Sequence, residues 1–205
     1  KYITVERPDI VINVVDASVL ERNLFFTLQL MEMETPMVIA LNQVDIAKAK
    51  GIEIDVKKLE KLLGVPVVPT VAVKGVGVTK LLEKAIETIE KGPMEKHAKT
   101  RYGEEVEEKI SKLMQMLSKV HIMYPPRYTA IKLLEGDEEI EQEVKRGNPQ
   151  IVSAAKKLAD EIRSLHGHAC STVITSERYE LAGCIARSAQ RLTSPIKPTC
   201  IERLH

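Results

Sequence analysis

Short apolar runs alternate with amphipathic stretches along the first 92 residues of the chain. Residues 10–16 and 37–41 are almost continuously β-branched or apolar, which is typical of strands buried on both faces. Residues 65–70 form a third run of this kind, with a proline near each end. The pattern therefore predicts three short, buried strands in this part of the chain.

The segments between and after these runs have the periodicity of helices. Ser18 and Glu21 form an S-x-x-E capping box, which predicts the start of a first helix. A second helix is predicted from Asp55 to Gly64 and a third is closed by Gly92, because glycine commonly ends helices. Strands that alternate with helices in this way predict parallel βαβ units. The apolar face of the first helix repeats at helical spacing: Leu20, Leu24, Leu28 and Met31.

After residue 92 the pattern changes, because no further β-branched run appears and every later segment predicts helix. Asn148 is placed to cap a helix that starts at Pro149 and ends at Gly167. A last helix is predicted over residues 173–192. The chain is therefore expected to hold an α/β domain, an all-helical domain and a linker, over residues 1–92, 93–192 and 193–205.

The composition is that of a soluble globular protein. Lys and Arg number 30 against 29 Asp and Glu, so the net charge of +1 gives no basic excess for nucleic-acid binding. No stretch approaches the roughly 18 apolar residues that a membrane helix needs, and we expect this chain to be soluble. Its three widely spaced cysteines argue against a disulfide framework and favour a reducing cytosol: Cys170, Cys184 and Cys200.

An N-x-x-D motif, Asn42 to Asp45, follows the second predicted strand, and residues 70–74 follow the third. Ligands of open α/β sheets bind beyond the carboxyl ends of the strands, so these two loops are expected to lie side by side. Asp45 could accept two hydrogen bonds from guanine, while adenine offers no matching pair of donors. A backbone N–H near Ala72 could donate to the guanine carbonyl oxygen, and Asn42 would brace the loops. In the alternative interpretation, Asn42 and Asp45 only cap the turn.

The chain carries no sequence for binding the phosphates of a nucleotide. A P-loop requires G-x-x-x-x-G-K-[ST], and no glycine of this chain is directly followed by lysine. There is also no D-x-x-G stretch to contact magnesium and a γ-phosphate. Phosphoryl transfer would therefore lack its charge neutralisation and its positioned water in this chain.

Beyond the motif, long segments resemble the cytoplasmic region of the ferrous iron transport protein B family, which transports iron across bacterial and archaeal membranes. The resemblance is carried by "RPDIVINVVDASVLERNLFFTLQLMEMETPMVIALNQVD" and "GIEIDVKKLEKLLGVPVVPTVAVKGVGVTKLLEKAI" in the first part of the chain. It continues through "YPPRYTAIKLLEGDEE" and "SERYELAGCIARSAQRLT", which are similar to the helical domain of that family. The resemblance covers almost the whole chain.

The resemblance implies a G domain of the P-loop GTPase type that binds GTP or GDP with Mg²⁺, and a helical domain that can modulate nucleotide release. A membrane domain of the same transporter would carry Fe²⁺, which places the family's G domain at the cytoplasmic face of the cell membrane. On this comparison the chain starts after the P-loop and the D-x-x-G motif and ends before the first membrane helix. It would hold only part of the GTPase-type sheet, lack the Mg²⁺ ligands and be inactive by itself.

By the same resemblance, the chain keeps the guanine-recognition half of the site. Gln43 stands where related GTPases have lysine, and Val71 stands where a serine usually precedes the base-contacting alanine. Both departures could weaken affinity without removing the discrimination by Asp45. The expected guanine contacts are Asn42, Gln43, Val44, Asp45, Val71, Ala72 and Val73.

The family's sheet would pair one more strand beside residues 10–15, so this apolar strand is expected to present an unpaired edge. We therefore expect either a segment supplied by another chain or a contact in a homo-oligomer. Two further functions stay open. A ribosome-assembly GTPase shares the strand-end motifs, but the acidic helices after residue 93 argue against its basic RNA-binding domain. A non-enzymatic interaction module would use the α/β part only as a scaffold.

Other candidate residues have a simpler structural interpretation. Asp16 is expected to be a turn residue ahead of the Ser18 cap, not a catalytic group. The sequence "HGHAC" suggests a metal site, but it offers only three ligands at an ordinary helix end, which favours no metal. Cys184 is expected to be buried and inert, and a methionine cluster is expected to fill the core: Met114, Met116 and Met123.

Overall fold

The computed structural model describes residues 3, 6, 8–91 and 101–193. They divide into two compact units that do not follow the order of the sequence. The boundary expected near residue 92 lies outside the described residues. The α/β unit comprises residues 9–27, 36–91 and 182–193, and the helical unit comprises residues 8, 28–35 and 101–181 together with residues 3 and 6.

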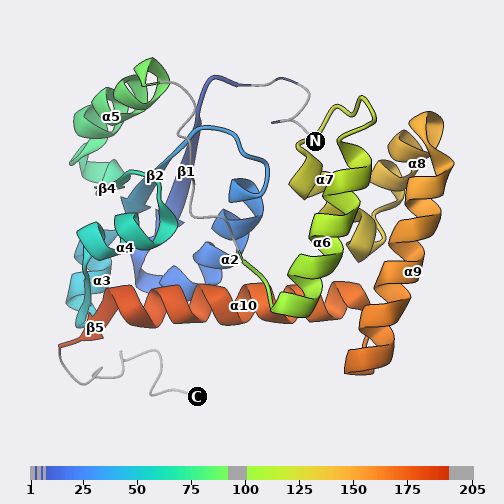
Figure 1. Ribbon diagram of the computed structural model, residues 1–205. Helices are drawn as coiled ribbons and strands as arrows, with labels where there is room; N and C mark the ends of the chain where they lie inside the picture. The colour runs from blue at the N-terminus through green and yellow to red at the C-terminus, as the bar shows by residue number, and fades with distance from the viewer. Residues whose placement is uncertain (1–2, 4–5, 7, 92–100, 194–205) are drawn as a thin grey trace. The chain divides into compact units, whose positions relative to one another are not determined.

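The α/β unit is built on a small parallel sheet (Figure 1). Two helices, α2 and α10, have residues in both units. The elements that contribute to the α/β unit are β1 (Val11–Asp16), η1 (Ala17–Val19), α2 (Leu20–Met31), β2 (Met37–Asn42), α3 (Val44–Ala49), β3 (Ile52–Ile54), α4 (Val56–Leu63), β4 (Val67–Pro69), η2 (Ala72–Lys74), α5 (Val78–Glu90), α10 (Cys170–Ala189) and β5 (Gln190–Leu192).

The sheet has the order β1-β2-β4, and both pairings are parallel. Its central strand β2 is buried from Met37 to Leu41, as its unbroken apolar run predicted. Helix α5 packs on β2 and β4, so this face of the sheet is covered (Figure 1). The parallel α/β architecture expected from the alternating pattern is confirmed.

The prediction that β1 is buried on both faces was wrong. Asn13 and Val15 are buried, whereas Ile12 and Val14 are 38% and 62% exposed. Successive side chains of a strand point to opposite faces, so only one face of β1 contacts the core of the described α/β unit. Within the described residues β1 pairs on one side only, with β2, and the expected unpaired edge is present.

The expectation that only helices follow residue 92 was also wrong. Helix α10 ends at Ala189, and the next three residues form β5, which pairs antiparallel with β3. Two backbone bonds close this pairing, from Asp55 N to Ala189 O (2.7 Å) and from Thr193 N to Gly51 O (2.8 Å). The end of the helical sequence therefore contributes a strand to the α/β unit, because a short edge strand can be formed by any residues that supply backbone groups in register.

The predicted helix ends are mostly confirmed. Asp55 accepts a hydrogen bond from Lys58 N at the start of α4, and Gly64 ends that helix in the left-handed conformation. The expected capping box at Ser18 was wrong, because Asp16 caps instead and accepts from Ser18 N at 2.8 Å. Ser18 lies inside the 3₁₀ turn η1, one residue before the position that would cap α2, and Asp16 is the turn residue that was expected.

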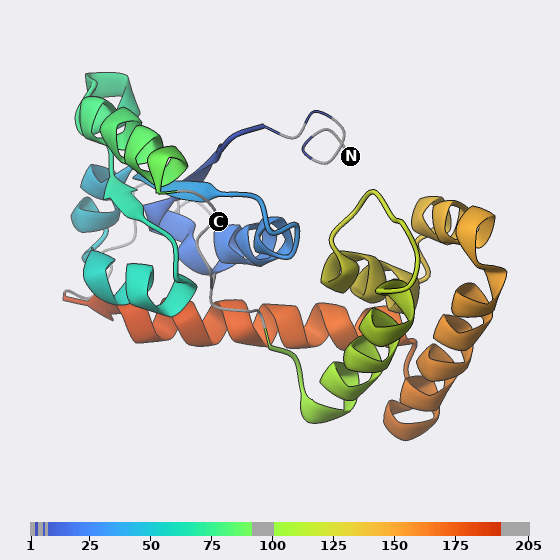
Figure 2. The same cartoon turned by 45° about the horizontal axis from the view of Figure 1, so that its top comes forward.

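The helical unit packs four helices and the first part of α10 around one apolar core. Helices α6 and α9 lie side by side in Figures 1 and 2, and α7 packs on both of them. Asn148 caps α9 through its side chain, Pro149 occupies the first turn and Gly167 ends the helix, as predicted. The four helices are α6 (Glu104–Leu117), α7 (Pro126–Glu135), α8 (Glu138–Gly147) and α9 (Pro149–His166).

A buried ionic cluster joins four distant parts of the sequence inside the helical unit. Arg178 of α10 is 1% exposed and donates to both carboxylate oxygens of Glu32, at 3.1 and 3.2 Å. The Tyr102 hydroxyl also donates to Glu32, and Arg178 reaches Glu135 at 3.1 Å. Burial raises the pKa of the Glu32 carboxyl, and the Arg178 guanidinium opposes that shift. Residues 28–35 therefore belong to this unit although they precede β2 in the chain.

We expect Arg178→Met to lower the free energy of unfolding by about 3–5 kcal/mol, because it leaves the Glu32 carboxylate buried without its cation. Chemical denaturation followed by circular dichroism measures this loss. The double variant Arg178→Met with Glu32→Leu is the matched control, and it should recover part of the loss because no unpaired charge remains. Equal loss in the single and double variants would contradict the assignment of the effect to the stranded carboxylate.

Candidate functional site

Two loops of the α/β unit follow the carboxyl ends of neighbouring parallel strands. The first loop connects β2 to α3, and the second contains η2 and follows β4. Leu41 pairs with Pro69 in the parallel register, so both loops leave the sheet at the same edge. In open α/β sheets this edge is where ligands bind. The expectation that the two loops lie together is confirmed.

Asn42 joins the two loops, because its side-chain oxygen accepts hydrogen bonds from the second loop. Its Oδ1 accepts from Thr70 Oγ1 at 3.2 Å and from Ala72 N at 3.0 Å. Thr70 is 2% exposed, so its hydroxyl obtains a partner that water does not supply. The bracing role expected of Asn42 is therefore present in the structure. The Ala72 N–H, expected to donate to a base, donates to Asn42 here.

The rest of the motif lies at the start of α3. Gln43 precedes the helix with φ 61° and ψ 33°, a left-handed conformation that is uncommon for a residue with a side chain. Val44 begins the helix, and Asp45 is its second residue. Asp45 Oδ1 accepts from Ile46 N at 3.0 Å, so the carboxylate caps the first turn. This bond alone does not decide between a turn cap and a ligand contact, because the carboxylate keeps a second oxygen for another partner.

The second loop is pinned on both sides of its 3₁₀ turn. Val71 is buried and forms an antiparallel bridge with Val76, with N···O distances of 3.0 and 3.3 Å. Ala72 and Val73 lie within η2 and are exposed, Val73 by 94%. Gly77 has φ 78°, and a Cβ there would lie 2.2 Å from the Pro69 carbonyl oxygen. Only glycine fits at that position, so the loop has little freedom to change its path.

The structure adds one residue that the sequence analysis did not single out, Lys74. Its Nζ lies 2.7 Å from Asp45 Oδ2 and so connects the end of η2 to the start of α3. This hydrogen bond lowers the pKa of the Asp45 carboxyl below its ordinary value, so the group is fully ionised at neutral pH. The signal in the sequence was a lysine two residues beyond Ala72 in the loop that faces Asp45.

The other candidates from the sequence do not assemble a second site in the described residues. His166 Nε2 lies 2.7 Å from Glu105 Oε2 at the end of α9, and no group of three or more His, Cys, Asp or Glu residues that could hold a metal ion is found among the described residues. Met114 and Met116 pack against the helical core as expected, but Met123 is 50% exposed.

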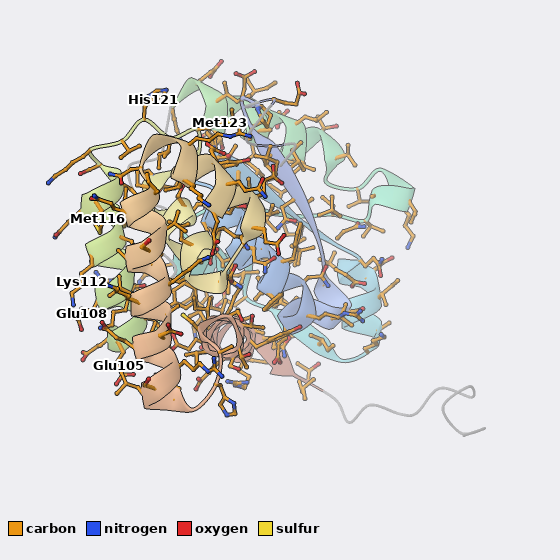
Figure 3. The ribbon with its side chains drawn as sticks, turned by 90° about the vertical axis from the view of Figure 1, so that its right-hand side faces the viewer. Glu105, Glu108, Lys112, Met116, His121 and Met123 are labelled. Carbon is orange, nitrogen blue, oxygen red and sulfur yellow. The ribbon has the colours of Figure 1, made fainter. Side chains whose placement is uncertain are left out.

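A groove of about 480 Å³ lies between α6 and α9 of the helical unit. Lys112, Met116 and Leu158 are among the residues that line it, and Figure 3 labels the first two on α6. Its carboxylate, Glu161, is held in an ion pair with Lys109 at 2.5 Å. The groove therefore presents mainly cationic and apolar groups. We place the candidate site at the strand-end loops of the α/β unit, where polar groups of both loops converge.

A parallel sheet with an N-x-x-D motif at its carboxyl edge, together with a helical unit, is the architecture of a G domain with a helical domain. Two family models match this chain: "Ferrous iron transport protein B" over residues 1–85 and "FeoB cytosolic helical domain" over residues 102–191. The chain belongs to the ferrous iron transport protein B family.

Relatives support this assignment over most of the chain. The chain is 36% identical over 190 residues to the Fe²⁺ transport protein A/Fe²⁺ transporter FeoB fusion protein of Porphyromonas gingivalis, covering 87% of this chain. It is 39% identical over 154 residues to the Fe²⁺ transporter FeoB of Staphylococcus aureus (strain COL), covering 74% of this chain. In both comparisons the match spans only 22% of the relative.

Solved structures of the family have the same fold. A GDP-bound mutant of NFeoB from S. thermophilus superposes with a TM-score of 0.84 and 32% identity, covering 92% of this chain and 72% of that chain. NFeoB from S. thermophilus bound to mGMPPNP gives a TM-score of 0.80 and 31% identity, with coverage of 97% and 73%.

No helix of the described residues is long and apolar enough to cross a membrane.

We expect Asn42→Ala to loosen the second loop, because Thr70 Oγ1 and Ala72 N would both lose their acceptor. Amide hydrogen exchange should become at least about fivefold faster for Ala72 and its neighbours, since one lost bond of about 1 kcal/mol or more shifts local opening by such a factor. Asn42→Asp is the matched control, because it keeps an acceptor oxygen and should retain most of the protection. Unchanged exchange in Asn42→Ala would show that the brace does not hold the loop.

The two described cysteines should differ in reactivity. Cys170 is buried, and burial raises the pKa of its thiol to about 12, so little thiolate forms at pH 8. Cys184 was expected to be buried but is exposed, because the buried face of this part of α10 is formed by other residues, such as Ala182 and Ile185. In a Cys200→Ser background, a thiol reagent should modify Cys184 and leave Cys170 unmodified. Comparable labelling of both would contradict the burial of Cys170.

Proposed function

We propose that the α/β unit binds guanine nucleotides at the two strand-end loops. The observation that carries the proposal is the convergence of Asn42, Asp45 and Ala72 at one edge of the parallel sheet. An ionised carboxylate at this position can accept from the ring N–H and the exocyclic amine of guanine, and adenine cannot supply both donors. The proposed contacts are Asn42, Gln43, Val44, Asp45, Val71, Ala72 and Val73.

The relatives support extending this proposal to the whole protein. S. thermophilus NFeoB structures contain GDP or mGMPPNP, and the curated relatives are Fe²⁺ transporters. We infer that the complete protein hydrolyses GTP with Mg²⁺ at the cytoplasmic face of the membrane and moves Fe²⁺ through a membrane domain. The residues of this chain would supply recognition of the base. They do not fit a Mg²⁺ ion at this site, because Asp45 is engaged by Lys74 and is the one carboxylate of the two loops.

A second candidate function is that of an interaction module, in which the helical unit binds a partner. The groove between α6 and α9 favours it, because lysines line it together with apolar residues. In that case nucleotide binding by this chain would be absent.

The test is a titration of fluorescent GDP and fluorescent ADP into this chain, with Asp45→Ala as the matched variant. We expect GDP to bind at least about tenfold more tightly than ADP, because a site that pairs two donors rejects a ligand without them. Asp45→Ala should abolish this preference. Absence of GDP binding at millimolar concentration would contradict the proposed nucleotide function and favour the interaction module.

A further inference from the structure

We propose that Lys74 is a positioning residue for guanine recognition: it holds the carboxylate of Asp45 in the orientation that accepts the base. The proposal rests on the guanine site proposed above. Lys74 is not among the contacts predicted from the sequence, and its ammonium group bonds directly to the one carboxylate that would distinguish guanine from adenine.

Both carboxylate oxygens of Asp45 have hydrogen-bond donors in the chain. Oδ1 accepts from Ile46 N at 3.0 Å, and Oδ2 accepts from Lys74 Nζ at 2.7 Å. A carboxylate held at both oxygens cannot rotate freely about its terminal bond. Each oxygen has two acceptor sites, so one site on each remains for the paired N–H groups of guanine. The base and the lysine can therefore bind the carboxylate at the same time.

Backbone hydrogen bonds hold the loop that carries Lys74. Its N–H donates to Val71 O at 2.9 Å, and the bridge between Val71 and Val76 closes the loop on either side of it. Gly75 follows in the left-handed conformation with φ 69°, which turns the chain back immediately after the lysine. This loop geometry therefore places the Lys74 side chain beside Asp45, which lies 29 residues earlier in the sequence.

The ion pair of Lys74 and Asp45 is partly exposed to solvent. The side chains of Lys74 and Asp45 are 63% and 38% exposed, so their attraction is screened by water and adds little to the stability of the fold. A pair of this kind can still orient a ligand-binding group before the ligand arrives, which reduces the entropy lost on binding. The expected gain in affinity is therefore modest, about two- to fivefold at low salt.

The test uses guanosine, because a ligand without phosphates leaves other charges of the chain out of the comparison. Binding is followed by the amide NMR signals of Ile46 and Ala72 in the full chain. Lys74→Met keeps an unbranched side chain and removes the charge, and it should weaken guanosine binding about two- to fivefold. Lys74→Arg should restore most of the affinity. Lys80→Met, on the exposed side of α5, is the matched control and should leave binding unchanged.

Salt provides a readout that a merely structural role would not move. Raising NaCl from 20 mM to 1 M screens the ion pair, so wild-type affinity should fall to that of Lys74→Met, whose own affinity should stay constant. Equal or tighter binding of guanosine by Lys74→Met at low salt, with binding still lost in Asp45→Ala, would overturn the role of Lys74 and leave the guanine site standing. Failure of the wild type to prefer guanosine over adenosine would overturn both.

Discussion

The bond between Asn42 and the second loop is the constraint on which the candidate site depends. One amide oxygen, at the last residue of β2, accepts from both Thr70 and Ala72 beyond β4. Parallel pairing brings two strand ends to one edge, but it does not determine the path of the loops beyond them. The Asn42 side chain supplies that path, and it lets the Asp45 carboxylate and the η2 backbone act as one surface.

This surface is satisfied within the chain. Ala72 N–H has Asn42 as its acceptor, and both oxygens of Asp45 have donors. A site whose polar groups are already paired changes little in shape when a ligand binds. In the proposed guanine site, selectivity for the base would come from the lone pairs of Asp45 that remain unused. Hydrogen bonds of this type exchange at small net free energy, so the proposed guanine site would discriminate between bases more than it would bind the base tightly.

In the helical unit, the ion pair of Arg178 and Glu32 connects segments that are distant in the sequence, as Asn42 does in the α/β unit. Both side chains are almost fully buried, and four segments of the chain contribute to the cluster that they form with Tyr102 and Glu135. A buried ion pair is often no more stabilising than apolar residues of the same size, but removal of one partner is costly. The pair links the segment that contains Glu32 to helix α10 within this unit. That segment, residues 28–35, leads directly into the strand that carries Asn42.

The sequence by itself determined the elements whose causes are local. The buried run of β2, the cap of α4 at Asp55 and the ends of α9 at Asn148 and Gly167 each depend on residues within a few positions of one another. The family was also evident from the sequence, because the segments that resemble it are long and uninterrupted. The proposed base contacts came from the same source, and their neighbourhood at one sheet edge followed from parallel pairing.

Only the tertiary structure decided the features that depend on partners distant in sequence. The residues after Ala189 form β5 because β3 offers backbone groups in register, and nothing in their own pattern predicts a strand. Ile12 and Val14 are exposed because one face of β1 packs on the described core, although the run is apolar throughout. Lys74 has its proposed positioning role only because the fold brings its side chain to Asp45, which is 29 residues away in the sequence. Local propensity specifies an element, but burial and pairing depend on what the rest of the fold places beside it.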